Sequence, residues 1–414
     1  MGVTFLHAAD LHLDRPFKGL SHVPESLSHR IRQSTFTAFQ QLITAAVEHK
    51  VDFVVIAGDL FDGHHPSLRA QRFAQKQFQR LAKNDISVYL VLGNHDFGLH
   101  QRLEQTFPEN VHVFPEDVSV QSFQKEGTTV HLYGFSYPER HLKQRKIDTY
   151  EKVDHADFHI GILHGYHEDG QDDHDVYAPF HLQDLLDKQF DYWALGHIHQ
   201  RQMLHDDPPV CYPGSSQGLS IKETGEKGAH IVNLDHQYGA AIQWLPVHDV
   251  QWTDPVVDVS QIQTAEQLSE HLEQIKEQLR QPQTGVLARI TLTGASPIKR
   301  LLLEPYHLQD LLDTLHEGEE EAPDFVWILD CHDAVVPEYD REALKNTNHF
   351  LGDLVRLRDT TETIDDWLEP LYQHKRAGRY LASLNQQEQQ EVLDEAEAWL
   401  IEQLSQAGEG GALD

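Results

Sequence analysis

Cysteine is scarce in this sequence. Among 414 residues there are two, Cys211 and Cys331, far apart along the chain. This scarcity argues against a disulfide framework and a cysteine-based zinc scaffold, and it fits a reduced compartment. Long apolar runs are missing too, since none approaches the roughly 18 residues that a membrane helix needs. The first residues lack the basic and apolar segments of a secretory signal. We therefore expect a cytoplasmic protein without a membrane partner.

Basic residues are also few. The chain has 33 Lys and Arg against 66 Asp and Glu, a net charge of −33. Residues 255–414 hold 12 basic and 32 acidic side chains, and therefore most of that charge. Proteins that bind nucleic acids are usually basic, so this balance at first counts against that class. Carboxylates that ligate metal ions would be neutralised, however.

The first 250 residues alternate short apolar runs with stretches of helical spacing, an order typical of a layered α/β domain. Strands are expected at 4–8, 53–57, 88–92, 130–134, 158–163 and 192–195, and helices at 34–49 and 67–83. Later runs at 210–213, 229–234 and 240–246 predict consecutive strands. The sheet should therefore be mixed.

The pattern changes near residue 254. A helix at 264–280, a strand at 286–293, a helix at 306–317 and a strand at 325–330 predict a smaller α/β domain. The chain from Glu342 onward is polar and helical, and its last helix places Val392, Ala396, Trp399 and Leu400 on one face. That face either packs on its own domain or docks a partner. We predict three parts: 1–254, 255–340 and 341–414.

Polar side chains of the kinds that ligate metals follow five predicted strands. The segments are AADLHLD, IAGDLFDG, LGNHDF, GILHG and WALGHIHQ. They supply Asp10 and His12, then Asp59, then Asn94, His95 and Asp96, then His164, and finally His197 and His199. Each segment alone could be an ordinary turn or surface loop. Since sites in open α/β sheets lie outside the carboxyl ends of the strands, five such segments together predict one site.

The set is large enough for two divalent metal ions. One ion would be held by Asp10, His12 and His199, and the other by Asn94, His164 and His197. Asp59 could bridge the ions, and alternation along an extended HIH segment would leave both histidines on one side. Oxygen and nitrogen ligands without thiolate suit manganese, iron or zinc. Two ions about 3.5–4 Å apart activate a water and stabilise charge at a phosphoryl centre.

Two residues of LGNHDF are predicted to act beside the metals. His95 would protonate the leaving oxygen after the activated water attacks phosphorus. Asp96 would orient His95 and stabilise its charge. The catalytic candidates are therefore His95 and Asp96.

At these residues the sequence resembles the calcineurin-like metallophosphoesterase superfamily. The shared pattern is D-x-H, G-D, G-N-H-[DE], a histidine after a strand and G-H-x-H, over about residues 4–200. The resemblance implies a four-layer α/β/β/α sandwich. HAADLHLDRPF, GDLFDGHHP and YPGSSQGLSIKETGEKG are similar to the SbcD-like DNA repair exonucleases, especially the YhaO-type Bacillus proteins. Residues 1–254 would then be the catalytic domain and 255–340 a capping domain. Ala9 departs from the serine or threonine typical of SbcD-like proteins.

The resemblance implies a manganese-dependent exonuclease or endonuclease that acts on DNA in repair. It also implies an SMC-like coiled-coil ATPase partner, bound through the C-terminal helices, and it leaves a homodimer open. Two other functions stay open. One is a phosphodiesterase or phosphatase that acts on a small nucleotide, and the other is a scaffold that keeps the fold without the chemistry.

Two groups of basic side chains are candidates for contact with DNA phosphates. Arg69, Arg72, Lys76 and Arg80 form one stripe on a predicted helix. Arg140, Lys143, Arg145 and Lys146 share a predicted loop. If DNA is the substrate, such groups must supply the attraction to its backbone. A solvated surface without a ligand is the alternative for both.

Overall fold

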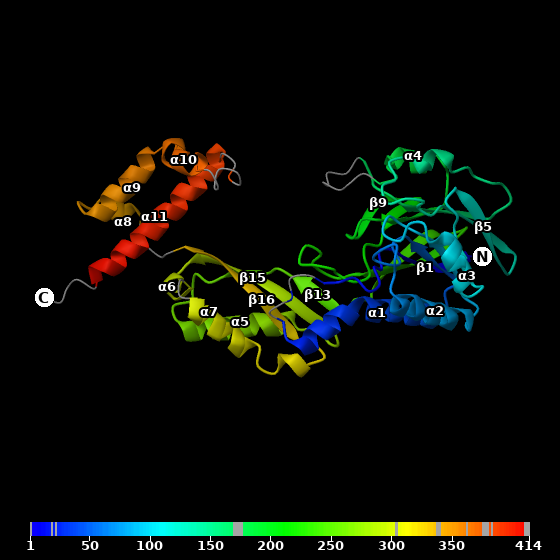
Figure 1. Ribbon diagram of the computed structural model, residues 1–414, viewed down its shortest axis with the longest axis horizontal. Coiled ribbons are helices and arrows are strands. Elements are labelled where there is room, and N and C mark those ends of the chain that lie inside the picture. The colour runs from blue at the N-terminus through cyan, green and yellow to red at the C-terminus, as the bar shows by residue number, and fades with distance from the viewer. Residues whose placement is uncertain are drawn as a thin grey trace. The chain divides into compact units, whose positions relative to one another are not determined.

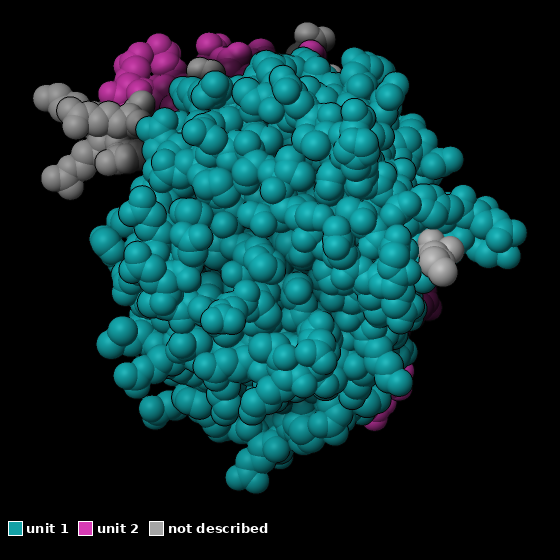
Figure 2. All heavy atoms as spheres, turned by 90° about the vertical axis from the view of Figure 1, so that its right-hand side faces the viewer, with its two compact units in different colours: residues 1–254, 276–289, 316–330 teal, residues 255–275, 290–315, 331–414 magenta. Residues whose placement is uncertain are grey.

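The computed structural model describes residues 2–17, 20, 23–168, 177–302, 305–336, 341–361, 363–374, 381 and 384–409. Its helices and strands are labelled in Figure 1, and it divides into two compact units, which Figure 2 draws in teal and magenta. Unit 1 consists of Met1–Asp254, Lys276–Arg289 and His316–Asp330, and unit 2 of Pro255–Ile275, Ile290–Leu315 and Cys331–Asp414. The three-part division expected from the sequence stays a prediction. Among the described helices, none combines the length and the apolar character that crossing a membrane requires.

Six strands form the first sheet of unit 1, in the order β12-β11-β1-β2-β3-β4. Their bounds are Gly2–Ala8 (β1), Phe53–Ala57 (β2), Ser87–Val91 (β3), Val111–Val113 (β4), Gly228–Asp235 (β11) and Gly239–Pro246 (β12). Strands β1 to β4 are parallel, whereas β11 and β12 run antiparallel to their neighbours. The expected mixed sheet is confirmed.

A second sheet of six strands has the order β5-β6-β7-β8-β10-β9. Its strands are Ser119–Lys125 (β5), Thr128–Gly134 (β6), Phe158–His164 (β7), Tyr192–Gly196 (β8), Gln202–Asp206 (β9) and Pro209–Tyr212 (β10). Apolar side chains of both sheets share one buried cluster, including Phe5 and Val55 from the first sheet and Leu132 and Ile160 from the second. Because apolar burial is the main favourable term in folding, this cluster holds the sheets face to face.

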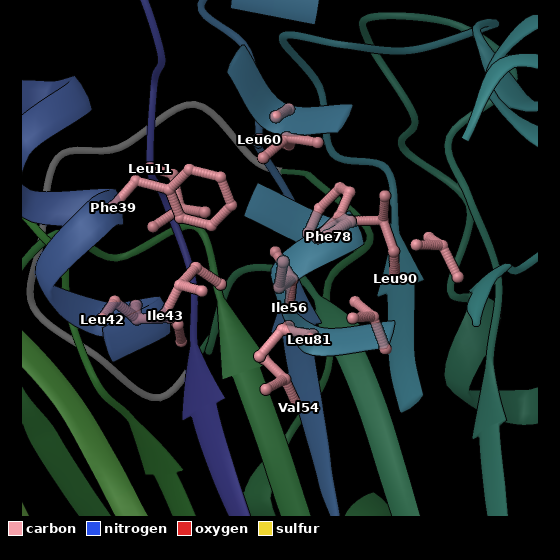
Figure 3. Packing of buried hydrophobic residues seen from close by; sticks show 14 of the residues in the cluster. Leu11, Phe39, Leu42, Ile43, Val54, Ile56, Leu60, Phe78, Leu81 and Leu90 are labelled. Carbon is pink, nitrogen blue, oxygen red and sulfur yellow. The ribbon is translucent and has the colours of Figure 1, made fainter. Parts of the chain in front are cut away.

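Helices α1 (Glu25–Glu48), α2 (Leu68–Ala82) and α3 (His100–Thr106) cover the outer face of the first sheet. In Figure 3, Phe39 and Ile43 of α1 and Phe78 of α2 lie with the side chains of β2. The Ser67 hydroxyl caps α2 by accepting the backbone N–H of Ala70 at 3.0 Å. Helix α4 (Leu182–Leu186) and the short 3-10 helix η1 (Lys146–Thr149) pack on the second sheet. The α/β/β/α order is confirmed.

A third, smaller sheet contains Val250–Thr253 (β13), Val256–Asp258 (β14), Gly285–Ala295 (β15) and Val326–Val336 (β16). Strands β13 and β14 each pair in parallel with β15, and β16 also pairs with β15. The accompanying helices are Ala265–Leu279 (α5), Lys299–Leu302 (α6), Pro305–Leu315 (α7) and the 3-10 helix Glu319–Glu321 (η2). Within unit 1, Trp252 and Phe325 pack against Leu27 and Ile31. This contact explains why α1 begins at Glu25, before the residue 34 expected from the sequence.

Helices α8 (Arg341–Lys345), α9 (Phe350–Thr360), α10 (Asp365–Tyr372) and α11 (Gln386–Glu409) end the chain within unit 2. Leu351, Val355 and Ile401 form a small buried cluster there. The face of α11 that carries Val392 and Trp399 is exposed, with Trp399 54 % accessible. Packing of that face on its own domain is therefore wrong for the described residues, because the helix turns Leu393 and Ile401 inward instead.

Candidate metal centre

The chain segments that leave β1 and β2 run side by side at the carboxyl edge of the first sheet. The N–H of Asp10 donates to the Gly58 carbonyl at 3.1 Å, and that of His12 donates to the Asp59 carbonyl at 3.0 Å. Asp10, His12 and Asp59 have φ of 52°, 43° and 52°, a left-handed conformation that is unfavourable for residues other than glycine. Such backbone strain persists where the surroundings impose it, and it is frequent at functional sites.

Two glycines let the strand ends approach closely. A Cβ atom on Gly93 would lie 2.3 Å from Asp59 Oδ1 and 2.7 Å from His164 Nε2. A Cβ atom on Gly196 would lie 1.8 Å from the Ala57 carbonyl oxygen. All three distances are far inside van der Waals contact. A larger residue at Gly93 would push polar side chains of the centre apart, and one at Gly196 would push the backbone of Ala57 away.

One cluster of ligand atoms joins Asp10, His12 and His199, all within 4.8 Å of one another. The Nε2 atoms of His12 and His199 are 3.1 Å apart. His12 is fully buried and Asp10 is 1 % exposed. The structure thus brings together the residues predicted for one ion.

A second cluster shares Asp10 with Asp59 and His164. The Oδ1 atom of Asn94 lies 2.9 Å from His164 Nε2. Asp59 Oδ2 is 3.5 Å from His164 Nε2 and 3.7 Å from His12 Nε2. The Asp59 carboxylate therefore lies between the two clusters, where a bridging ligand would have to be.

The hydrogen bonds of His164 indicate which ring nitrogen carries the proton. Its Nδ1 lies 3.0 Å from the Ala57 carbonyl, which can only accept, so Nδ1 must donate. In the neutral ring, Nε2 then presents a lone pair to the oxygens of Asn94 and Asp59. Acceptors that converge in this way repel one another unless a cation lies among them. This donor set, nitrogen and oxygen without thiolate, fits a divalent metal ion.

Burial and the neighbouring histidines shift the pKa values of the carboxylates in the centre in opposite directions. Burial acts to raise the pKa of Asp59, but the nearby His164, His12 and His95 outweigh it and lower this pKa to about 2. For Asp10 burial prevails and raises the pKa, although His199 and His164 oppose the shift. Burial also lowers the pKa of His12. A neutral imidazole beside an ionised Asp59 is the protonation state that binds metal.

His197 lies at the centre but not in the conformation expected. Its φ is 101°, so the HIH segment bends instead of running extended. The backbone N–H of His197 donates to both carboxylate oxygens of Asp10, at 3.1 and 3.0 Å. Its ring centroid is 5.2 Å from that of His164. Among the described His, Cys, Asp and Glu side chains, the clusters near this centre do not include His197, so its role as a ligand stays a prediction.

The expected pairing of Asp96 with His95 is wrong. The carboxylate of Asp96 is buried and accepts the backbone N–H groups of Gly93 at 2.7 Å and Phe61 at 3.2 Å. His95 Nδ1 instead lies 3.0 Å from the carbonyl oxygen of Asp62. Asp96 therefore ties together the chain segments after β2 and β3, while another residue orients the ring.

Asp62 is that residue, and sequence reasoning gave it no role. Its Oδ1 is 3.2 Å from His12 Nδ1, 3.7 Å from His95 Nδ1 and 2.7 Å from Arg15 Nη1. Burial acts to raise the pKa of Asp62, but the hydrogen bond and charge of His12, followed by Arg15, lower it. The second aspartate of GDLFDG was the available signal.

Glu223 was also missed. Its Oε1 lies 3.0 Å from His199 Nδ1, 24 residues away in the sequence. Burial acts to lower the pKa of His199, but the hydrogen bond to Glu223 and the charge of Asp10 raise it. The pKa of Glu223 is correspondingly lowered: burial opposes this shift, and His199 outweighs it. A carboxylate behind a metal-binding histidine fixes its tautomer and raises its basicity.

Several predicted DNA contacts are engaged inside the protein. Arg145 lies within 3.8 Å of carboxylate oxygens of Asp148, Glu168 and Asp184. Lys146 is 9 % exposed and donates to the Glu116 carbonyl at 3.3 Å. Because these partners cancel or bury the positive charge, neither side chain is an available surface cation. Arg140 and Lys143 are exposed.

Of the four basic side chains predicted to form a stripe on α2, two contact other side chains of the protein and two are exposed. The guanidinium of Arg69 lies 4.5 Å from the Phe36 ring centroid and donates to Gln33. Arg80 donates to Gln77 at 2.7 Å and to Thr44 at 3.0 Å. Arg72 and Lys76 are exposed. These two side chains are the members of the stripe best placed to meet a ligand from solution.

Two protein families match the chain. The family described as calcineurin-like phosphoesterase matches residues 3–201, and the middle domain of metallophosphoesterase YhaO matches residues 252–335. The uncharacterized metallophosphoesterase YhaO of Bacillus subtilis is 41 % identical over 97 % of this chain and 98 % of its own length.

More distant matches bear the name DNA double-strand break repair protein Mre11. The protein of Thermoplasma acidophilum is 27 % identical over 56 % of this chain and 62 % of its own length. That of Methanopyrus kandleri is 25 % identical over 77 % of this chain and 73 % of its own length.

Proposed function

Because this chain belongs to the calcineurin-like metallophosphoesterases of the YhaO type, we propose that it is a two-metal phosphodiesterase that cleaves DNA, with manganese as its metal. The observation that carries the proposal is the position of Asp59 between two clusters of buried imidazole and carboxylate ligands. A site that is shared by two ions suits the hydrolysis of phosphate esters.

The residues divide into those that hold metal and one that handles a proton. Asp10, His12 and His199 would hold one ion, and Asn94, His164 and the predicted ligand His197 the other, with Asp59 common to both. When bound, the ions would supply an activated water and stabilise negative charge on the phosphoryl oxygens. His95 lies beside His12, with ring centroids 4.7 Å apart. Since its Nδ1 is held by Asp62, Nε2 is the atom that would protonate the leaving oxygen.

DNA as the substrate is supported by the Mre11 matches and by the exposed cations Arg72, Lys76, Arg140 and Lys143. We expect an SMC-like coiled-coil ATPase to act with the chain through its C-terminal helices. Exposed apolar side chains there, including Trp367 at 58 % and Trp399 at 54 %, support a docking role.

A small nucleotide diester is the second candidate substrate. The observation that favours it is the loss of Arg145 and Lys146 as free cations, since a long DNA backbone needs several basic contacts and a small ligand needs few. The two candidates share the metal centre and the acid, so they differ only in what is cleaved.

The test is incubation of the purified chain with linear double- and single-stranded DNA in manganese. His95→Ala, purified in parallel, controls for contaminating nucleases. Cleavage that requires metal and disappears in the variant supports the nuclease. If DNA stays intact while bis(p-nitrophenyl) phosphate is hydrolysed, the small diester is favoured. If neither substrate is hydrolysed, the phosphodiesterase proposal fails.

A further inference from the structure

We propose that Glu223 is a positioning residue that sets the affinity of one of the two metal sites by holding the ring of His199. This role rests on the two-metal function proposed above. It concerns the site formed by Asp10, His12 and His199, which Glu223 would support from outside the ligand set. Glu223 acts on the ring through the hydrogen bond from His199 Nδ1 to Glu223 Oε1, at 3.0 Å.

That hydrogen bond fixes the chemistry of the ring. An ionised carboxylate can only accept, so His199 Nδ1 carries the proton and Nε2 presents its lone pair. The Nε2 atom lies 3.1 Å from His12 Nε2, inside the cluster with Asp10. Without Glu223 the ring could rotate or take the other tautomer, and the lone pair would then point away from the cluster.

Glu223 is itself held rigidly. Its Oε2 accepts the backbone N–H of Leu219 at 3.2 Å and the hydroxyl of Ser215 at 3.3 Å. Its side chain is 18 % exposed. Lys227, 6 % exposed, donates from Nζ to the carbonyl of His199 at 3.0 Å and so fixes the backbone of the same residue. A partner fixed on several sides can impose an orientation on the ring, whereas a mobile surface carboxylate could not.

The two metal sites differ in this respect. The ring of His164 is held by the backbone carbonyl of Ala57, a neutral acceptor. The ring of His199 is held by a charged side chain. Loss of Glu223 should therefore weaken the site of Asp10, His12 and His199 and leave the site of His164 and Asn94 intact. Changes to partners of this kind typically cost about 10–100-fold in metal affinity.

The experiment is calorimetric titration of the metal-free full chain with Mn²⁺. We compare wild type with Glu223→Ala and with Glu223→Gln, which keeps an acceptor but loses the charge. Glu226→Gln is the matched control, because it removes an exposed carboxylate three residues away in the same loop. Thermal unfolding of the metal-free proteins separates metal effects from folding effects.

We expect the wild type to bind two Mn²⁺, and Glu226→Gln to bind two with the same affinities as the wild type. Glu223→Ala should bind one as in wild type and the other about 10–100-fold more weakly, with Glu223→Gln between them. With two Mn²⁺ per chain, at a concentration above the wild-type Kd and below that of the weakened site, electron paramagnetic resonance should show coupled pairs of ions in wild type and mainly single ions in Glu223→Ala.

Two Mn²⁺ bound with wild-type affinity by a folded Glu223→Ala chain would overturn the role of Glu223 and leave the proposed function standing. Equal weakening of both sites would overturn the claim of control over one site. A wild-type chain that binds no Mn²⁺ would overturn the two-metal function itself, together with this inference.

Discussion

His95 Nδ1 lies 3.0 Å from the carbonyl oxygen of Asp62, so the ring of the predicted acid is held by the segment after β2. The Asp62 carboxylate lies 3.2 Å from His12 Nδ1. Asp62 thus links a predicted metal ligand to the predicted proton donor. A proton donor held through Nδ1 can exchange its other proton at Nε2 without losing its orientation.

Replacement of His95 should separate catalysis from metal binding. We expect His95→Ala to lower kcat on bis(p-nitrophenyl) phosphate about 10²–10⁴-fold, the usual loss when a general acid is removed. The metal content should stay that of wild type, because the Nδ1 of His95 binds a carbonyl and the ring is partly exposed. Steady-state rates and elemental analysis check the two halves. Loss of a metal ion in His95→Ala would show that the residue is a ligand.

Asp96 should matter for stability. Asp96→Ala leaves the N–H groups of Gly93 and Phe61 without their buried acceptor. Each unsatisfied buried group costs about 1–3 kcal/mol, so the loss of an acceptor for both should lower the free energy of unfolding by about 2–6 kcal/mol. Urea denaturation of the metal-free chain measures this loss, with the exposed Asp154→Ala as control. An Asp96→Ala chain as stable as wild type would contradict the structural role.

The metal ligands could be predicted from the sequence better than the residues that hold them in place, for a physical reason. Asp10 and Asp59 follow neighbouring parallel strands of the first sheet, and His164 ends a strand of the second. The carboxyl ends of such strands meet once the two sheets pack face to face. Asp96 was misassigned because adjacency in sequence says little about pairing when the backbone turns. Glu223 has no periodic signal, since a loop places it against His199 from 24 residues away.

Unit 1 also shows a limit of helical periodicity. The first turns of α1 were missed because Leu27 and Ile31 face Trp252 and Phe325, and not the layer that buries the rest of the helix. The pattern of apolar residues therefore changes along one helix. Tertiary contacts decide such a boundary, and they are not local properties of the sequence.

If DNA is the substrate, exposed cations should contribute more to DNA binding than cations that are already paired with carboxylates. The double variant Arg72→Gln, Lys76→Gln should weaken binding to DNA. The slope of log K against the logarithm of the salt concentration should become shallower by about one for each phosphate contact that is lost. Arg145→Gln removes a charge that three carboxylates already surround and should change the slope little. Fluorescence anisotropy with inactive His95→Ala protein at several salt concentrations measures both. Equal effects of the two changes would contradict the assignment.

A buried chain of polar groups lies between the two sheets. His7 Nδ1 is 3.0 Å from the Tyr192 hydroxyl, which is 3.0 Å from Cys211 Sγ, and Cys211 Sγ is 3.6 Å from His230 Nδ1. Burial, followed by the charge of Arg201, lowers the pKa of His230 to about 4 from its ordinary 6.5. Burial likewise lowers the pKa of His7. Both rings are therefore neutral in the folded protein at neutral pH.

This arrangement should make the fold sensitive to acid. Well above pH 6.5 neither the folded nor the unfolded chain protonates His230, so stability there does not depend on its titration. As the pH falls from 6.5 towards 4, the unfolded chain binds a proton that the folded chain does not. The unfolded state is therefore favoured increasingly, by up to about 3 kcal/mol for this residue alone.

His230→Gln removes that titration, so its free energy of unfolding should vary less between pH 6.5 and 4 than that of wild type. The exposed His49→Gln serves as control and should follow the wild-type curve. Urea denaturation of metal-free protein at several pH values gives the three curves. Parallel curves for His230→Gln and wild type across this range would show that the folded chain protonates His230 as readily as the unfolded chain does, which would contradict the prediction.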